Sequence, residues 1–389
     1  MDQEKATLPI LPPARWAGPS APMKRPREIA CFSYTSNHEY RPDASGLRYY
    51  YPPRLGADLC KGFESFEKLD DSPDDHLDSL LKTIMGVEKE GGKKVEVDVV
   101  TWRGMMTKLL ACPFEERDGF EMNATFYQGT IYIEENHSYK VQSQARQSKI
   151  QTAPGRPSQD MMSYWGYKFE TLCLLPDTWD ATSREYIEGR EEQIVNNAAQ
   201  YCSVVQTGIG KTSLIIGGEV DAIWDSKSPT TPPNWVELKT SLDPSSPRAL
   251  QTFERKLLKF WLQSFLLGVP KIIVGFRNAD GLLRRLEELE TAKIPGIVKK
   301  RGGWDGNVAV NFGAEVLRFL KAVVNSEGVW RIRRAERSGV LEVFKIEEVG
   351  HGEILSEEFI NWRIKLALKE EGGEKGQSEE ESEVQSEAS

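Results

Sequence analysis

The spacing of apolar residues predicts alternating strands and helices along most of the chain. Residues 95–102 carry β-branched side chains at every second position and predict a strand, and a helix is expected over 104–110. Residues 120–134 predict a β-hairpin that turns at Gln128-Gly129. From residue 163 we expect helices at 164–174, 183–197 and 246–268, and strands at 201–207, 213–224, 235–240 and 271–276. This order indicates an α/β fold, a mixed sheet flanked by helices.

The irregular stretches suggest how the chain is divided. Residues 1–28 are rich in proline and predict a flexible arm, whose Lys24-Arg25-Pro26-Arg27 fits either a nuclear-localisation patch or a merely solvated segment. Residues 29–368 predict one large domain: a β-rich N-terminal lobe (about 29–140), a core (about 160–280) and a C-terminal extension (about 281–368). Polar residues 140–160 predict a loop between lobe and core. Residues 369–389 predict an acidic disordered tail.

Composition narrows the chemistry. The formal net charge is −9, and five cysteines without a C-x-x-C pair favour reduced thiols over a disulfide frame or a zinc site. The four histidines are not grouped at metal-ligand spacing, so a metal site must use carboxylates, which favours Mg²⁺ or Mn²⁺. No apolar run approaches a membrane span of about 18 residues and the N-terminus lacks the features of a signal peptide. We therefore expect a soluble protein that is not secreted and has no membrane partner.

The segment Gly208-Ile209-Gly210-Lys211-Thr212 imitates the end of a phosphate-binding P-loop. A complete motif needs a glycine five positions before Gly210, where this chain has Val205. The segment also joins two predicted strands and is not followed by a helix N-terminus, which a P-loop requires. We therefore predict a hairpin turn here and no nucleotide site.

A second group of residues carries more chemistry. Glu219 and Asp221 are two apart, and so are Glu237 and Lys239, so each pair shares one face of a strand. If the strands are neighbours, three carboxylates and a lysine meet on one patch of sheet. Their mutual repulsion raises their pKa values unless a cation lies among them, and a divalent metal can also neutralise charge on a reacting phosphate. Ordinary surface charges or cross-strand ion pairs are the alternative, and Glu170 is a fourth candidate.

Asp221 followed by Glu237-x-Lys239 within this order of elements resembles the PD-(D/E)xK nuclease core. Four further motifs strengthen the likeness, and with them the chain resembles the DXO family of RNA 5′-end quality-control enzymes. The motifs are Thr101-Trp102-Arg103-Gly104, Gly166-Tyr167-Lys168-Phe169-Glu170, Gly218-Glu219-Val220-Asp221 and Lys259-Phe260-Trp261-Leu262-Gln263-Ser264-Phe265. The match runs from about Arg48 to Arg277, and it makes the large domain the catalytic one.

The resemblance implies a role for each matching residue. Glu219, Asp221, Glu237 and the main-chain carbonyl of Leu238 would bind Mg²⁺, with Glu170 acting directly or through a water. Lys239 would position the nucleophile or contact the reacting phosphate. Substrate contacts are implied for the residues Arg48, Trp102, Arg103, Gly104, Cys202, Glu219, Lys239 and Gln263. Structural roles compete for several of these, since Arg48 fits a surface charge, and Trp102 and Cys202 fit core positions.

The activity implied is a Mg²⁺-dependent hydrolase that acts on RNA 5′ ends. Members of the family remove pyrophosphate from 5′-triphosphate RNA, release incompletely methylated guanosine caps or NAD caps, and in some cases continue as 5′→3′ exonucleases. The fungal branch includes a protein that partners a nuclear 5′→3′ exoribonuclease, so we expect a nuclear location and this exoribonuclease as a partner. The alternative function is a mainly non-catalytic one, in which the chain stabilises or activates that exoribonuclease. A DNA endonuclease on the same core is a third possibility that the wider motif set disfavours.

Overall fold

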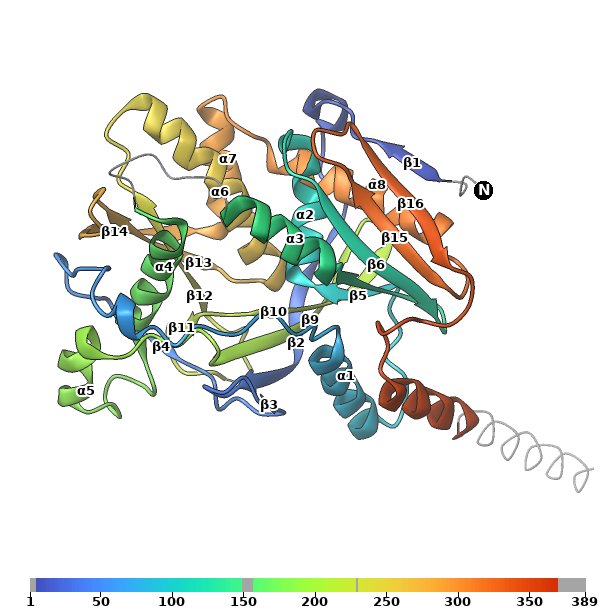
Figure 1. Cartoon of the computed structure of the whole chain (residues 1–389), viewed down its shortest axis with the longest axis horizontal. Coiled ribbons are helices and arrows are strands. Elements are labelled where there is room, and N and C mark those ends of the chain that lie inside the picture. The colour runs from blue at the N-terminus through green and yellow to red at the C-terminus, as the bar shows by residue number, and fades with distance from the viewer. Residues whose placement is uncertain (1–4, 149–156, 229, 370–389) are drawn as a thin grey trace, which may run out of the picture.

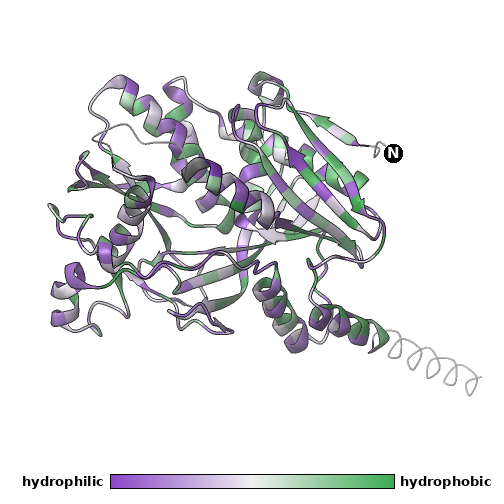
Figure 2. Cartoon of the chain, viewed as in Figure 1, coloured by the Kyte–Doolittle hydropathy of each residue, from purple (hydrophilic) through white to green (hydrophobic). Residues whose placement is uncertain are grey.

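Two β-sheets form the frame of the protein in the computed structural model, which describes residues 5–148, 157–228 and 230–369. Figure 1 places the larger sheet on the right, ending at β1, and the smaller sheet on the left, ending at β14, with helices α2, α3 and α6 between them in this view. In Figure 2 apolar and polar residues alternate along the strands of the larger sheet, the pattern of strands with one face in the core. No helix in the described ranges is both long and apolar enough to span a bilayer.

The larger sheet has ten strands drawn from both ends and the middle of the chain. Strand β5 pairs in parallel with β7 on one side and β10 on the other, and the remaining pairs are antiparallel. In spatial order the strands are β1 (Ala6–Pro9), β16 (Val340–Glu347), β15 (Val329–Arg334), β6 (Phe120–Tyr127), β7 (Thr130–Glu135), β5 (Val99–Trp102), β10 (Thr212–Glu219), β9 (Gln200–Ile209), β2 (Met23–Tyr34) and β3 (Tyr40–Arg41).

The smaller sheet has six strands. Its order is β14 (Leu283–Glu290), β13 (Lys271–Arg277), β12 (Trp235–Leu242), β11 (Ala222–Ile223), β4 (Tyr49–Tyr50) and β8 (Leu174–Leu175). Helix α6 (Pro247–Leu267) connects the parallel strands β12 and β13. The hydroxyl of Ser246 accepts a hydrogen bond from the Ala249 N–H and caps the start of α6, and Gly268, at φ 74°, ends it in the left-handed conformation that glycine adopts without strain.

Helices cover both sheets and enclose three apolar clusters. Helices α2, α6 and α8 pack into the largest cluster, α1 contributes to a second with the C-terminal helix over 357–369, and α4 packs on the smaller sheet. The remaining bounds are α1 (Asp78–Gly91), α2 (Arg103–Ala111), α3 (His137–Ser148), α4 (Gln159–Cys173), α5 (Arg184–Glu188), α7 (Ile294–Lys300) and α8 (Gly306–Val323), with 3₁₀ turns η1 (Pro13–Trp16), η2 (Phe63–Ser65), η3 (Cys112–Phe114), η4 (Gly189–Glu192) and η5 (Thr291–Lys293).

Several sequence predictions are confirmed. Strands β6 and β7 form the predicted hairpin, and α6 and β13 lie within one residue of their predicted bounds. Residues 208–212 are indeed a hairpin: Thr212 pairs with Ile209, and Gly210, at φ 60°, makes the turn between β9 and β10. The order of elements from α4 to β13 is the mixed arrangement expected.

The predicted division of the chain is wrong in three places. Residues 6–28 are not a flexible arm, because β1 pairs with β16 and β2 pairs with β9. The lobe and the C-terminal extension are not separate units, because β15 pairs with β6 inside the larger sheet. Part of the predicted loop, residues 140–148, belongs to α3; residues 149–156 of it, like the acidic tail from 370, lie outside the described residues.

Several element bounds also differ from prediction: residues 213–224, expected as one strand, form β10 and β11 in different sheets, and α4 begins at Gln159, five residues before its expected start. The strand expected over 95–102 begins only at Val99, so the alternating residues before Val99 lead into the sheet without forming part of the strand. The helix expected over 183–197 ends its α-helical part at Glu188 and continues as the 3₁₀ turn η4, although Ser183 caps it as predicted. In these last two cases side-chain pattern extends beyond the backbone hydrogen bonds that define the element.

Candidate active site

The acidic residues lie where the chain crosses from the larger sheet to the smaller one. Glu219 is the last residue of β10, and the Val220 N–H still donates to Tyr201 O of the larger sheet at 3.0 Å. Ala222 already pairs with Val236 in the smaller sheet, so the crossing takes two residues. The predicted neighbouring strands are therefore in different sheets, and the crossing itself brings Asp221 beside β12.

Glu237 on β12 is fully buried and holds the centre of the group. Its carboxylate accepts from Lys239 Nζ at 2.6 Å and from Arg103 Nη1 at 3.1 Å. Burial alone would raise the pKa of Glu237, but the charges of Arg103 and Lys239 outweigh burial and lower it. Arg103 is the first residue of α2 and directly follows β5 of the larger sheet. The ion pair therefore links the end of β5 to Glu237 on β12 of the smaller sheet.

The other three carboxylates are not neutralised in this way. Burial, then the charge of Asp221, raise the pKa of Glu219 to about 8. Burial and the charge of Glu237 raise the pKa of Asp221 to about 6, although Asp221 Oδ2 accepts a hydrogen bond of 2.6 Å from the Leu238 N–H. Glu170, on α4, has its pKa raised well above the usual value by burial and by Asp221 and Glu219. These three carboxyl groups thus lie close together, and the negative charge of each disfavours ionisation of the others.

The residues fit a hard divalent cation in charge and chemistry. Oxygen ligands from carboxylates and main-chain carbonyls are those that Mg²⁺ and Mn²⁺ prefer, and a cation would remove the repulsion that raises these pKa values. Within the ranges that the structure describes, however, no three acidic, histidine or cysteine side chains already stand at ligand spacing. Glu237 is hydrogen-bonded to Arg103 and Lys239, so a bound ion would share its carboxylate with these two cations. Assignment of the metal ligands stays a prediction.

Four of the eight implied substrate residues line two hollows: Arg48, Trp102, Cys202 and Glu219. The other four, Arg103, Gly104, Lys239 and Gln263, line neither hollow. A narrow cavity of about 60 Å³ is lined by Arg48, Glu170, Glu219 and Asp221, among others. The Arg48 guanidinium is turned back to the chain and donates to Leu47 O at 2.9 Å. The second hollow, of about 320 Å³, is lined by residues of both strands and helices, including Trp102, Cys202, Gly218 and Glu219.

Trp102, Cys202 and Gly104 each have a definable setting. The Trp102 ring packs against the Cα of Gly217 and its Nε1 donates to His76 O at 3.2 Å. Cys202 is buried and is the pairing partner of Glu219 across β9 and β10, so it fits a structural role at least as well as a binding one. Gly104 is exposed in the first turn of α2. Gln263 is half-buried on α6, one turn before Leu267, which lies against Gly218.

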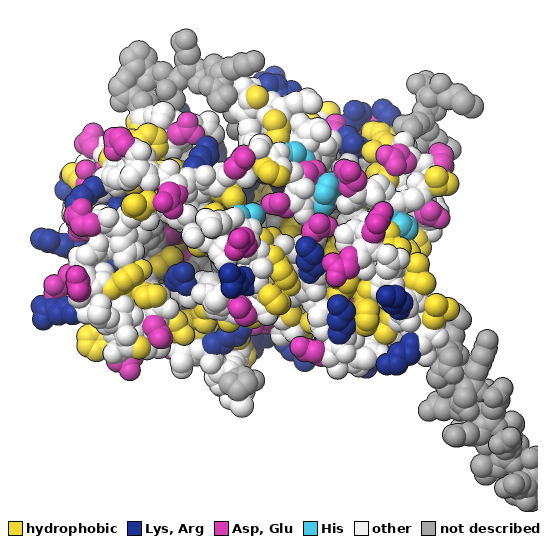
Figure 3. Space-filling model, turned by 60° about the horizontal axis from the view of Figure 1, so that its bottom comes forward, with side chains coloured by type: hydrophobic (Ala, Val, Ile, Leu, Met, Phe, Trp, Pro, Cys, Tyr) yellow, Lys and Arg dark blue, Asp and Glu magenta, His cyan; other side chains and the backbone are white. Residues whose placement is uncertain are grey.

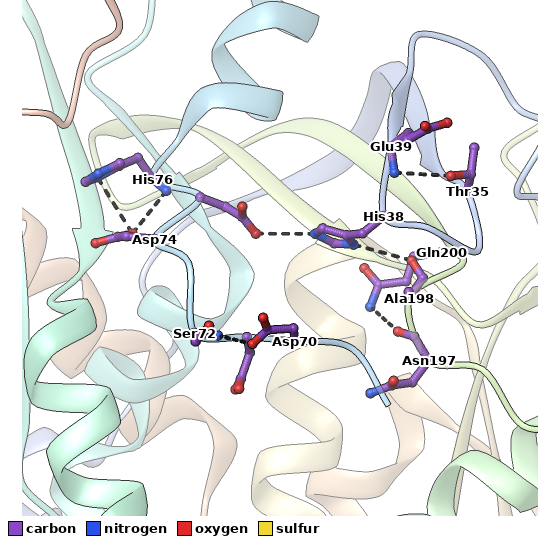
Figure 4. A network of polar contacts seen from close by, with 12 residues as sticks. Thr35, His38, Glu39, Asp70, Ser72, Asp74, His76, Asn197, Ala198 and Gln200 are labelled. Atoms are coloured by element: carbon purple, nitrogen blue, oxygen red, sulfur yellow. Dashed lines mark hydrogen bonds and ion pairs between the residues drawn. The ribbon is translucent and has the colours of Figure 1, made fainter. Parts of the chain in front are cut away.

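Sequence reasoning missed a segment that borders the larger hollow. Residues 67–77 cross this region and are held by long-range hydrogen bonds, from Leu69 N to Asn197 Oδ1 at 2.7 Å and between His137 Nε2 and Ser72 O at 2.8 Å. Figure 4 shows further polar contacts of this region, among them the hydrogen bonds that Ser72 N donates to Asp70 and His76 N donates to Asp74, and Figure 3 shows histidines among acidic side chains on this face. His38, His76 and His137 all line the hollow. The only hint in the sequence is Asp74-Asp75-His76, a pattern that has no metal-ligand spacing.

Comparison with known proteins places these observations in a family. The model of the family described as RAI1 like PD-(D/E)XK nuclease matches residues 24–360. Proteins named decapping nuclease RAI1 resemble the chain closely: that of Gibberella zeae is 56% identical over 368 residues, covering 93% of this chain and 98% of the relative. That of Aspergillus fumigatus is 57% identical over 361 residues, covering 92% and 98%.

Solved structures agree in fold. Candida albicans Rai1 in complex with pU5-Mn²⁺ superposes with a TM-score of 0.85 at 29% identity, covering 93% of this chain and all of that one (100%). Scheffersomyces stipitis Rai1 with (3′-NADP)⁺ and calcium gives 0.84 at 29% identity, covering 90% and 97%. By the family model over residues 24–360 and by these relatives, the chain belongs to the RAI1-like PD-(D/E)XK nuclease family.

Proposed function

We propose that this protein is a divalent-metal-dependent hydrolase of RNA 5′ ends. It would remove pyrophosphate from 5′-triphosphate RNA and release incompletely methylated guanosine caps or NAD caps. The observation that carries the proposal is the group of Glu170, Glu219 and Asp221, whose raised pKa values indicate a place for a cation. The relatives support it by their name, decapping nuclease, and by the pU5-Mn²⁺ and (3′-NADP)⁺ complexes of their solved structures.

The chain's own groups have separable tasks in this reaction. Bound Mg²⁺ or Mn²⁺ supplies charge neutralisation at the reacting phosphate and lowers the pKa of water. Lys239, whose pKa is raised by Glu237 and Asp221 against the effect of burial, stays protonated and can meet negative charge that develops on the phosphate. Arg103 is a second fixed cation at the same place. The raised pKa of Glu170 favours its protonated form, so this carboxyl group can hold a proton near the reacting phosphate. It can release the proton, and take it back, when the neighbouring charges change.

The test uses RNAs that differ only at the 5′ end: triphosphate, unmethylated guanosine cap, NAD cap and monophosphate. Each is incubated with the protein and Mn²⁺ or EDTA, and the released small molecules are identified by mass. The isosteric double variant Glu219→Gln/Asp221→Asn should lose activity, and Glu64→Gln, on an exposed carboxylate of η2, is the matched control. Absence of release from every end by well-folded wild-type protein would refute the proposal. Mononucleotide products would add exonuclease activity.

We further propose, from the family resemblance, that the protein works in the nucleus beside a 5′→3′ exoribonuclease. The basic run Lys24-Arg25-Pro26-Arg27 lies in β2. The side chains of its lysine and of both its arginines are exposed, although β2 is paired within the larger sheet. Imaging of a tagged protein and of a variant with these three cations replaced by glutamine tests the location. Co-purification of the exoribonuclease with wild type and with Glu219→Gln tests the partnership, since a separate binding role predicts that the variant still captures it.

A further inference from the structure

Lys227 lies on the stretch of chain that connects β11 to β12, and its ammonium group contacts both sheets. In the larger sheet its Nζ lies 2.5 Å from Glu28 Oε1 on β2 and donates to the Tyr201 hydroxyl on β9 at 2.7 Å. The same Nζ lies 5.3 Å from the centroid of the Tyr201 ring and 5.5 Å from that of the Trp235 ring, on β12 of the smaller sheet. One cation thus spans the junction of the sheets through an ion pair, a hydrogen bond and two cation–π contacts.

The groups that hold Lys227 also hold one another. Glu28, whose side chain is 13% exposed, accepts from Ser203 Oγ at 2.7 Å and from the Tyr201 hydroxyl at 3.1 Å. Burial, and then the charge of Glu28, raise the pKa of Tyr201, so this hydroxyl stays protonated and remains a donor. The Tyr201 and Trp235 rings meet with their centroids 5.4 Å apart. We call these five residues, Glu28, Tyr201, Ser203, Lys227 and Trp235, the Lys227 cluster.

The Lys227 cluster borders the crossing between the sheets on both sides. On the side of the larger sheet, Tyr201 O accepts the hydrogen bond from the N–H of Val220, the residue after Glu219. On the side of the smaller sheet, Trp235 and Glu237 are two apart on β12, so their side chains share one face of the strand. The contact between the two rings, with the ammonium group over both, therefore sets the spacing between β12 and the β9–β10 pair, which ends at Glu219.

This spacing matters because the carboxylates come from different sheets. Glu219 ends β10 and Glu237 lies on β12, and the negative charges of such groups repel each other when no ion lies between them. A group that holds the sheets together keeps the carboxylates in place for an ion, so that less rearrangement opposes binding. We propose that Lys227 is a positioning residue for the metal site: it fixes the two sheets at the spacing at which Glu219 and Glu237 bind the same divalent ion. This inference rests on the proposed function, because it places the ion between these carboxylates.

The test measures binding of Mn²⁺ in the absence of RNA, from the electron paramagnetic resonance signal of the free ion. Lys227→Met keeps the apolar stem and removes the ammonium group. Glu28→Gln/Lys227→Met also removes the charge that would lose its partner, which guards against misfolding. Lys227→Arg retains a cation that can donate to Glu28 and stack on both rings, and Lys211→Met is the matched control, on an exposed lysine at the turn between β9 and β10. We expect Mn²⁺ affinity to fall about tenfold in Lys227→Met and in the double variant, to be largely retained in Lys227→Arg and to be unchanged in Lys211→Met.

Hydrolysis of a 5′-triphosphate octanucleotide gives an independent readout. The Mn²⁺ concentration for half-maximal rate should rise about tenfold in Lys227→Met. The KM for the RNA at saturating Mn²⁺ should not change, because the substitution removes no proposed contact with RNA.

Denaturant unfolding in EDTA separates a positioning role from a merely structural one. A Lys227→Met protein that is less stable than wild type but binds Mn²⁺ equally well would overturn the inference, and so would an equal loss of Mn²⁺ affinity in Lys211→Met. If wild type binds Mn²⁺ and hydrolyses none of the RNAs, the proposed function fails, and the Mn²⁺ affinities of the variants still decide the inference. Wild type that binds no Mn²⁺ would overturn both.

Discussion

Replacing Glu219 by glutamine should stabilise the metal-free protein while removing its activity. Burial and the charge of Asp221 disfavour ionisation of the Glu219 carboxyl group, and its pKa rises from 4.5 to about 8. A carboxyl group whose folded pKa is raised contributes stability that is fully present below its unfolded pKa of about 4.5 and is lost as pH rises through about 8. Glutamine has the same shape and carries no charge at any of these pH values.

The size of the effect follows from the shift. At about 1.4 kcal/mol for each pKa unit, a rise of this extent corresponds to between 4 and 5 kcal/mol, roughly, for an isolated buried group. Glu219 is only partly shielded from solvent, and its titration is shared with Asp221, so we expect a smaller net gain of about 2 kcal/mol at pH 8.

Denaturant unfolding at pH 5 and pH 8 in EDTA measures this gain. We expect Glu219→Gln to be more stable than wild type at pH 8 and nearly equal at pH 5. Mn²⁺ should then stabilise wild type more than the variant, because the ion replaces the missing counter-charge only where the carboxylate exists. A variant that is no more stable than wild type at pH 8, with the same pH profile, would show that the carboxylates do not repel one another and would remove the main physical argument for a cation.

Three further outcomes follow from contacts elsewhere. The hydrogen bond to a buried glutamate raises the pKa of His76 to about 9, so its stabilisation is complete below about pH 6.5 and lost as pH rises through 9; His76→Asn should flatten the thermal unfolding profile over that range. Arg363→Met strands the fully buried carboxylate of Glu88 and should cost about 3–5 kcal/mol in chemical denaturation, and a loss under 1 kcal/mol would contradict this. In Gly218→Ala the new methyl would stand 2.9 Å from the Cβ of Arg103. We expect kcat to fall by about ten- to hundredfold at normal secondary structure by circular dichroism.

The sequence predicted individual elements well and their partners poorly. Helix α6 and the hairpin of β6 and β7 follow from side-chain periodicity and turn residues, which are local signals. That β1 pairs with β16 is not written in either strand, because β1 is four residues long and contains Pro9 at its end. Prolines within residues 1–28 therefore suggested an arm where the chain adds an edge strand, a position that tolerates proline.

The candidate site was found from spacing, but its geometry depends on long-range contacts. Glu219 and Asp221 were expected on one strand beside Glu237, but Glu219 ends β10 and Asp221 lies in the crossing between the two sheets. The pairing of Glu237 with Arg103 joins residues 134 positions apart, which no local pattern encodes. His76 was missed for the same reason, since its significance comes from the hollow that several distant segments form around it.

The strand order also constrains when the protein can fold. As the chain leaves the ribosome, β1 emerges long before its partner β16, which is made more than three hundred residues later, and β6 likewise waits for β15. Until then the larger sheet has open edges that can pair with other chains. We therefore expect this sheet, and with it the crossing that assembles the active site, to be completed only after β16 has been made, and nascent chains that stop before residue 340 to depend on chaperones for solubility.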